Sequence, residues 1–208
     1  MDTVMGLIIG VGLSAACGFR VFVPLLGMSI ANLAGHLALS PGFEWIGTWP
    51  ALIGFATATV LEVGAYCIPW LDNLMDTMAT PAAIVAGTIV TASQVGDMSP
   101  LLKWSLAIIA GGGVCAVTQT GTVLIRATSS GTTGGLGNIA VSFVELISAI
   151  AVTALAIIVP ILCLLVMLVV FYKMARIILK SRTLLKRPAA QPVAMSLNPV
   201  RPKKRRES

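Results

Sequence analysis

Four charged side chains interrupt segments that are otherwise apolar: Arg20, Glu62, Arg126 and Glu145. A charge at the depth of a bilayer costs about 2.5 kcal/mol or more, so it normally faces a polar cavity or another charge. Arg20 and Glu62 lie deep inside their segments, whereas Arg126 and Glu145 lie nearer the expected helix ends, where long side chains reach water. We expect these residues either to line a polar cavity or to form structural pairs, the clearest being Arg20 with Glu62.

A second group of candidates, Asp72, Asp76 and Thr80, lies in a polar stretch before the apolar segment 81–95. Fifteen residues form a helix only about 22 Å long, less than the hydrocarbon thickness of a bilayer. A half-helix that begins at Thr80 and Pro81 would direct free N–H groups inward, as in transporters with broken helices. A tilted ordinary helix is the alternative. Asp72 and Asp76, four residues apart, would share a helix face and could hold a cation or a proton.

The third group lies in the glycine-rich run 127–138, which includes Gly134, Gly135 and Asn138. Glycines let the backbone approach a ligand, and free N–H groups before a helix can bind an anion. The run lacks the lysine of a phosphate-binding loop, so nucleotide binding is not indicated. A flexible loop between helices is the alternative to an anion site.

Enzymatic chemistry finds little support in the sequence. His36 is the only histidine, and the four cysteines lie far apart, each in an apolar stretch, with no C-x-x-C pair. No histidine pair or cysteine cluster is therefore present to hold a metal, and no nucleophile motif is recognisable. We expect no catalytic residue, no metal and no cofactor, and no enzyme activity.

Composition places this chain in a membrane. Its 208 residues are 57% hydrophobic and 11% charged, with a mean hydropathy of +0.94, whereas soluble domains average about 25% charged residues. Of its 14 Lys and Arg residues, 11 fall between Lys173 and Arg206. We therefore expect a transmembrane domain over 1–175 and a basic, largely disordered tail over 176–208 that attracts anionic lipid headgroups rather than nucleic acid.

Five segments approach the length that a membrane-spanning helix needs. They are 4–33, 50–71, 81–95, 101–125 and 139–172. Pro50, Pro81 and Pro100 each follow a threonine or serine within two residues, as at helix starts. The sequence thus predicts an all-α polytopic protein with about five transmembrane helices; six is the alternative, because the last segment is long enough to fold back near Pro160. The basic residues after it place the C-terminus in the cytoplasm, and an odd number of crossings then places the N-terminus outside.

The two halves of the chain show a similar order of features. Each has a glycine-rich segment with an arginine, Arg20 or Arg126, followed by a segment with a glutamate, Glu62 or Glu145. Such halves, if inverted in the membrane, follow a common transporter plan with a site at the midplane. The spacing between arginine and glutamate differs between the halves, so ordinary helix pairing is the alternative. The small size of the chain also makes a homodimer plausible.

Three blocks resemble a known family. They are Gly12–Pro24, which contains Arg20, the stretch Pro69–Ala83, which contains Asp72 and Asp76, and Thr133–Asn138. With these blocks the chain resembles the small bacterial integral membrane proteins called domain of unknown function 4126, over residues 5 to about 172. The resemblance implies a membrane protein of this topology in the bacterial inner membrane and draws attention to the same charged and glycine-rich positions. It implies no substrate.

Two functions follow from these residues. The first is a small transporter or channel-like protein whose pathway contains Arg20, Glu62, Asp72, Asp76 and Thr80, together with Arg126, Gly134, Gly135, Asn138 and Glu145. Its carboxylates would exchange protons or cations while Arg20 or a helix N-terminus holds an anionic group. The second is a scaffold or lipid-interacting membrane protein in which the charges are structural pairs.

Overall fold

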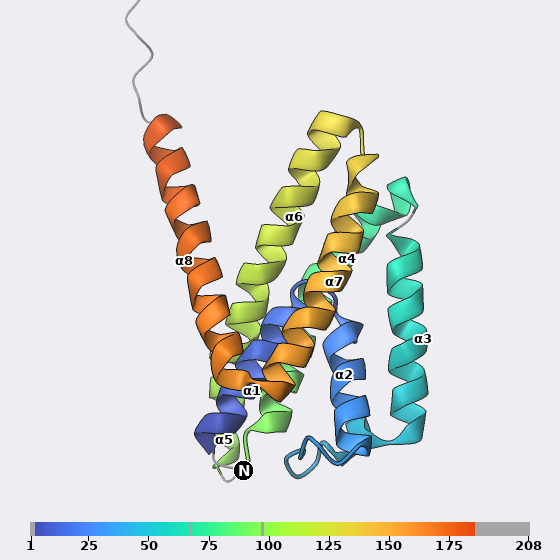
Figure 1. Cartoon of the computed structure of the whole chain (residues 1–208), viewed down its shortest axis with the longest axis vertical. Helices are drawn as coiled ribbons and strands as arrows, with labels where there is room; N and C mark the ends of the chain where they lie inside the picture. The colour runs from blue at the N-terminus through green and yellow to red at the C-terminus, as the bar shows by residue number, and fades with distance from the viewer. Residues whose placement is uncertain (1–2, 67, 97, 186–208) are drawn as a thin grey trace, which may run out of the picture. The chain divides into compact units, whose positions relative to one another are not determined.

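The computed structural model describes residues 3–66, 68–96 and 98–185 (Figure 1). For residues 69, 70, 72–76, 174 and 177–185 it describes the backbone alone. The chain divides into two compact units, Met1–Val169 and Val170–Ser208, and the site below lies within the first. Residues 186–208 lie outside the described residues, so the tail stays a prediction.

Within the described residues the chain is helical and has no strand, which confirms the predicted all-α class. In chain order the elements are α1 (Thr3–Cys17), α2 (Phe22–Leu33), η1 (Glu44–Gly47), α3 (Trp49–Ala65), α4 (Pro69–Gln94), α5 (Pro100–Leu106), η2 (Ala107–Gly112), α6 (Gly113–Thr133), α7 (Gly137–Ile158) and α8 (Pro160–Leu185).

The first predicted crossing, 4–33, is instead a helical hairpin. α1 ends at Cys17, the chain turns through Gly18–Val21, and α2 runs back toward the end from which α1 started (Figure 1). The two helices have 15 and 12 residues, so each is only about 18–23 Å long. Gly18 permits the turn to approach α6, since a Cβ there would lie 2.8 Å from the Cys115 carbonyl oxygen. Hydropathy cannot distinguish one long helix from two short ones, and for that reason the prediction was wrong.

The proline signals identify two of three helix starts correctly. α3 begins after Thr48, whose hydroxyl accepts a hydrogen bond from the Ala51 N–H, and α5 begins at Pro100. Pro81, however, lies inside α4, which is continuous from Pro69 to Gln94. The half-helix predicted at Thr80 is therefore wrong, because proline is tolerated within helices where neighbours satisfy the released backbone groups.

The predicted fourth segment is one long helix. α5, η2 and α6 run continuously over Pro100–Thr133, 34 residues, and the middle piece η2 has the wider turn of a π-helix. Gly111 lies against Thr91 and Gly87 of α4. Gly10 of α1 lies against the same Thr91, with a Cβ there only 2.9 Å from its Cα. Glycine thus permits close packing of these helices.

The predicted last segment, 139–172, is two helices. α7 ends at Ile158, Val159 leaves the helical conformation, and α8 starts at Pro160. Proline lacks an N–H and fits the first helical position, so it ends one helix and begins the next. The structure thus follows the alternative in which this segment breaks near Pro160.

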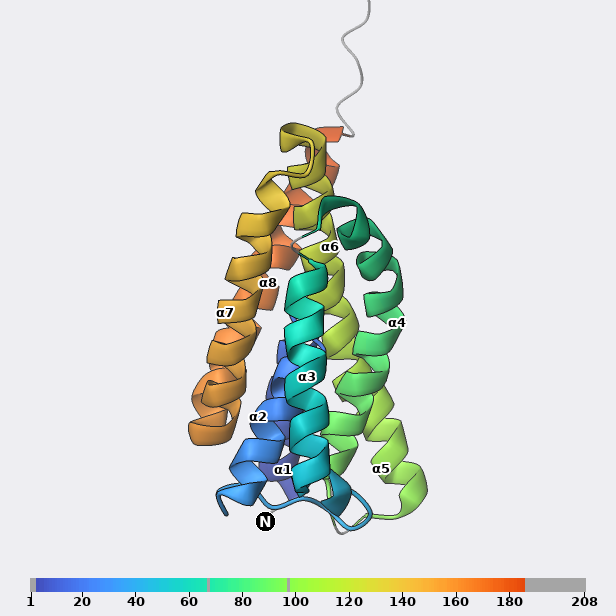
Figure 2. The ribbon, with the colours of Figure 1, turned by 90° about the vertical axis from the view of Figure 1, so that its right-hand side faces the viewer.

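Two helices of the described residues are long and apolar enough to cross a bilayer, Pro100–Thr133 and Gly137–Ile158. Shorter apolar helices include α1, α2, α3 and the first part of α8. In two perpendicular views, α3 starts near the end of α2 and runs toward the end where α6 and α7 are joined (Figure 2). The predicted inverted repeat stays a prediction: the glycine-rich segment of the first half doubles back, whereas its counterpart is a continuous helix.

Candidate functional site

The turn between α1 and α2 delivers Arg20 to α7. The Arg20 side chain is fully buried, and its Nη2 donates to the carbonyl oxygen of Ser142 at 3.0 Å. The same nitrogen donates to the Ser142 hydroxyl and lies 3.5 Å from Oε2 of Glu145. An arginine from the first part of the chain is therefore held by two residues of α7, one turn apart.

Arg126 of α6 contacts the same glutamate, Glu145. Its Nε donates to Glu145 Oε1 at 2.9 Å, and its Nη2 forms an ion pair with Oε2. This is the two-pronged geometry that arginine and carboxylate favour. Both side chains are nearly fully buried, so the pair lies in a medium where charge interactions are strong.

Local structure explains why Arg126 and Glu145 meet. Helices α6 and α7 are joined by a tight turn in which Gly134 and Gly135 have φ of +63° and +93°, a region that glycine adopts without strain. Arg126 lies nine residues before Gly135 and Glu145 ten residues after it. In an antiparallel helix pair these positions are level with one another.

Tyr66, at the end of α3, joins the two arginines. The guanidinium carbons of Arg20 and Arg126 lie 4.2 Å and 3.9 Å from the centre of its ring. A cation over an aromatic face is worth about 0.5–2 kcal/mol, more when both groups are desolvated. We call Arg20, Tyr66, Arg126 and Glu145 the arginine cluster.

Glu62 of α3 binds the start of α2 rather than an arginine. Its Oε1 accepts from the Val21 N–H at 2.9 Å and its Oε2 from the Phe22 N–H at 3.2 Å. The first N–H groups of a helix have no partner within the helix and carry the positive end of its dipole. The expected direct pair of Arg20 with Glu62 is thus not formed, because α2 supplies the donors to Glu62 and α7 supplies the carboxylate to Arg20.

A cavity of about 830 Å³ opens beside Glu62. It lies between the start of α2, the second half of α3 and the middle of α4. Its walls are Val21, Phe22, Ala58, Val60, Leu61, Glu62, Gly64, Ala65, Tyr66, Ile68, Leu71, Met78, Ala79 and Ala82. Among the side chains that the structure describes there, Glu62 is the only charged one and Tyr66 the only other polar one, so the described part of the cavity is an apolar space with one polar end.

Arg20 keeps two donors without a partner. Its Nε and Nη1 are buried and form no hydrogen bond, and an unsatisfied buried donor costs about 1–3 kcal/mol. Arg20 directly precedes Val21 and packs on Tyr66, and both of these residues line the cavity. Unpaired buried groups of this kind in a folded protein usually indicate water, an ion or a ligand.

The other predicted site residues lie apart from this cluster or outside the described side chains. Gly134 and Gly135 lie in the turn between α6 and α7, and Asn138, the second residue of α7, donates to the Ser130 hydroxyl of α6 at 2.8 Å. The turn therefore uses its polar groups internally, and the predicted long loop is mostly helix, since α6 extends to Thr133. Thr80 is half-buried within α4, and the side chains of Asp72 and Asp76 lie outside the described residues.

Tyr66 and Ser142 are not among the site residues predicted from the sequence. A spacing signal was available for both, because Tyr66 follows Glu62 by four residues and Ser142 precedes Glu145 by three. Residues three or four apart lie on one helix face. Among the described residues, no group of three or more His, Cys, Asp or Glu side chains could hold a metal ion.

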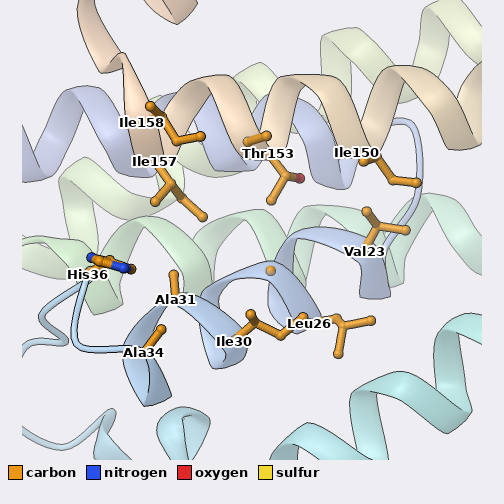
Figure 3. A pocket seen from close by; sticks show the side chains of 12 residues that line it. Val23, Leu26, Ile30, Ala31, Ala34, His36, Ile150, Thr153, Ile157 and Ile158 are labelled. Carbon is orange, nitrogen blue, oxygen red and sulfur yellow. The ribbon is translucent and has the colours of Figure 1, made fainter.

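A second cavity, of about 740 Å³, lies between α2 and α7. Figure 3 shows isoleucines of both helices lining it, with Thr153 and His36 as its polar side chains. None of the predicted site residues whose side chains the structure describes lines it. The charged site and this cavity are therefore separate features.

Comparison with protein families gave one match, to the family described as Domain of unknown function (DUF4126), over residues 7–180. The matched range contains the complete arginine cluster and Glu62. Comparisons with curated proteins and with solved structures gave no match.

Proposed function

The chain belongs to the DUF4126 family, whose name carries no activity, and we propose from its geometry that it is an integral membrane protein acting as a small transporter or channel-like protein. The pathway would pass Glu62 and the arginine cluster. In this proposal the chain has no enzyme activity and no cofactor, and its working form is a monomer or a homodimer in the bacterial inner membrane.

The apolar outer surface supports the membrane assignment. Large hydrophobic side chains are more than half exposed along three helices, among them Val60 of α3, Ile109 of the long helix and Ile147 of α7. No residue of α3 is buried, although this helix has only one charged residue, Glu62. Such a surface is too apolar for water and suits lipid. The buried polar groups lie inside, as expected for a helical membrane bundle.

The observation that carries the transport proposal is the hairpin of α1 and α2. Two half-helices end beside the arginine cluster, so a helix N-terminus and a buried arginine with two unpaired donors meet inside the bundle. Irregular backbone at membrane depth is tolerated where it lines a cavity or is buried in protein, and helix ends of this kind bind ions and substrates in transporters. A cavity lined by Val21, Phe22 and Tyr66 opens beside this helix N-terminus.

We expect replacement of Arg20 to reduce the transport rate strongly while the fold persists. In Arg20→Ala, Glu145 keeps its pair with Arg126, so the bundle retains its central contact. Hydrogen bonds to a charged group are worth about 1.5–3 kcal/mol, so the flux should fall roughly tenfold to a hundredfold. The measurement is solute uptake into proteoliposomes, screened over protons, simple cations and organic anions, with equal amounts of folded protein.

The matched control for this assay is Thr57→Val. Thr57 is exposed on α3, and its hydroxyl bonds only to the Ile53 carbonyl of its own helix. Its flux should equal that of the wild-type chain. Wild-type chain that carries no solute in the panel would overturn the transport proposal.

The proposed topology has the α1–α2 hairpin as a re-entrant element and five crossings: α3, α4, α5–α6, α7 and α8. Three of them separate Glu44 in η1 from Leu136 in the turn after α6. With the basic tail in the cytoplasm, Glu44→Cys should react with a membrane-impermeant maleimide in intact cells. Leu136→Cys should react only after permeabilisation.

The labelling is done in a Cys67→Ser background, because Cys17, Cys115 and Cys163 are buried. Labelling of both positions from the same side would mean an even number of crossings between them. That result would exclude the proposed arrangement of α3, α4 and α5–α6 as three crossings.

A scaffold is the second candidate, and the pairing of Glu145 with Arg126 and Arg20 favours it. In that case the cluster joins the α1–α2 turn to the end of α3 and to α6 and α7, and it transports nothing. A chain that folds, inserts and binds anionic lipid through its tail but shows no flux would have this function.

A further inference from the structure

Glu62 occupies a place that is built for an anion. Its two carboxylate oxygens accept from two successive backbone N–H groups at the start of the 12-residue helix α2. Helix N-termini bind carboxylates, sulfates and phosphates in this way. Immediately before these donors stands Arg20, 1% exposed, with Nε and Nη1 unpaired.

A charge count over the described side chains indicates what this site can accept. Arg20 and Arg126 carry two positive charges, and Glu62 and Glu145 carry two negative ones, so the charges of these described side chains sum to zero. A cation added beside Glu62 would leave one uncompensated positive charge, and an anion would leave a negative one. An isolated charge away from water costs several kcal/mol. When an anion binds and Glu62 takes up a proton, the net charge of these groups stays at zero.

The volume and the lining of the cavity beside Glu62 indicate the chemistry of the rest of the ligand. Its volume of about 830 Å³ lies within the range of small-molecule sites, which are mostly apolar with a few polar groups at one end. Val60, Leu61 and Met78 line it and are also more than half exposed on the outer surface. An occupant with an apolar body could therefore enter from the lipid side.

We propose that this site takes an amphiphilic monoanion whose oxyanion head replaces the Glu62 carboxylate. The head accepts hydrogen bonds from the N–H groups of Val21 and Phe22 and from the free donors of Arg20, and the apolar body fills the cavity. Glu62 takes one proton from water onto its released carboxylate, so that one anion and one proton enter together. This inference rests on the proposed function, since it names the substrate class of the same site.

Other titratable groups surround Glu62. From α1 comes Cys17, from the turn Arg20, from α3 Tyr66, and from α6 and α7 the pair of Arg126 and Glu145. On α4 stand Asp72 and Asp76, whose side chains lie outside the described residues. Glu145 stays bound to Arg126 in the proposed exchange, which leaves Glu62 as the described carboxylate that is released.

The test is a binding measurement on the full chain in lipid nanodiscs with decanesulfonate, whose head stays ionised at every pH used. Calorimetry in two buffers of different ionisation enthalpy should show uptake of about one proton for each bound ligand, and the affinity should rise about tenfold for each unit of falling pH. Methanesulfonate, which has the same head without the body, should bind far more weakly. Empty nanodiscs measure the partition of the probe into lipid.

Two kinds of variant separate the head from the body. Glu62→Gln carries a permanently neutral side chain, so it should bind decanesulfonate without proton uptake and with an affinity independent of pH. Gly64→Leu should abolish binding, because Gly64 lines the cavity and a Cβ there meets no atom within 4 Å, which leaves the longer side chain to fill the space. Gly54→Leu is its control: Gly54 is on the same helix, is equally open and does not line the cavity.

Three results would overturn the inference: binding without proton uptake in the wild-type chain, equal binding by the Gly64 and Gly54 variants, or displacement of the probe by decyltrimethylammonium. The Gly64 and Gly54 pair keeps the test decisive even where Glu62→Gln does not fold. Proton-linked binding without flux would contradict the transport proposal alone. Flux lost in Arg20→Ala together with binding that lacks proton uptake would contradict this inference alone.

Discussion

Glu145→Gln should destabilise the folded chain by about 3–5 kcal/mol, the usual cost of removing one partner from a buried ion pair. Glu145 is the described carboxylate that compensates both Arg126 and Arg20. The amide is isosteric but neutral, so two guanidinium groups would stay buried beside one aromatic ring without the carboxylate that pairs with both of them. The loss is measured as a change in the free energy of unfolding. The chain in mild detergent is titrated with a denaturing detergent while circular dichroism reports its helix content.

The control is Glu44→Gln, which removes an exposed carboxylate that bonds to the Gly42 N–H and should leave the unfolding midpoint nearly unchanged. A double-mutant cycle makes the test specific. Arg126→Gln should cost much less in a chain that already carries Glu145→Gln than in the wild-type chain, because the partner is absent. Additive effects of the two changes would show that the observed pair contributes nothing to stability.

Gly111→Val should separate the long helix from α4 and cost at least the roughly 1–3 kcal/mol of an overpacked core. A Cβ at this position would lie 2.7 Å from the Gly87 carbonyl oxygen and 2.7 Å from Thr91 Cβ. The first obstacle is backbone, which cannot rotate away. Since Gly10 of α1 packs on the same Thr91, the displacement should extend to three helices.

Gly113→Val provides a close comparison for this variant. Gly113 lies two residues further along the same continuous helix, and a Cβ there meets nothing within 4 Å. Both changes add the same side chain and remove the same backbone freedom, so only the contact with α4 differs. Thermal unfolding should show a clearly lower midpoint for Gly111→Val alone, and equal midpoints would refute the close-packing explanation.

The sequence identified the charged residues whose burial costs free energy, but not the residues with which they pair. Arg20, Glu62, Arg126 and Glu145 stand out because each is a charge in an apolar stretch, a property visible in a single residue. Which arginine meets which glutamate depends on where the helices turn. Once Gly134 and Gly135 are known to form the turn between α6 and α7, the pairing of Arg126 with Glu145 follows from equal distances along an antiparallel pair.

The partner of Arg20 could not be obtained in the same way. Hydropathy predicts that residues 4–33 are buried in an apolar medium but does not predict their direction. In the hairpin, the backbone N–H groups of Val21 and Phe22 bind Glu62, and the guanidinium of Arg20 binds α7. A single continuous helix would not produce this arrangement. The interruption at Arg20 and Pro24 was visible in the sequence. The chain reverses direction at this interruption, and Gly18 lets the turn pack closely against α6. This contact involves a third helix, so it cannot be read from the local sequence.

The hairpin also has a consequence for biosynthesis. Arg20 and its hydrogen-bonding partner Ser142 are 122 residues apart, so the ribosome releases the arginine long before it makes α7. Neither α1 nor α2 is long enough to span a bilayer alone, and a lone arginine disfavours insertion. In the proposed topology, residues 3–33 should therefore wait at the membrane surface and enter the bundle last, after the segments that neutralise the charge of Arg20 have been inserted. A segment made before α7 would thus be the one that completes the fold.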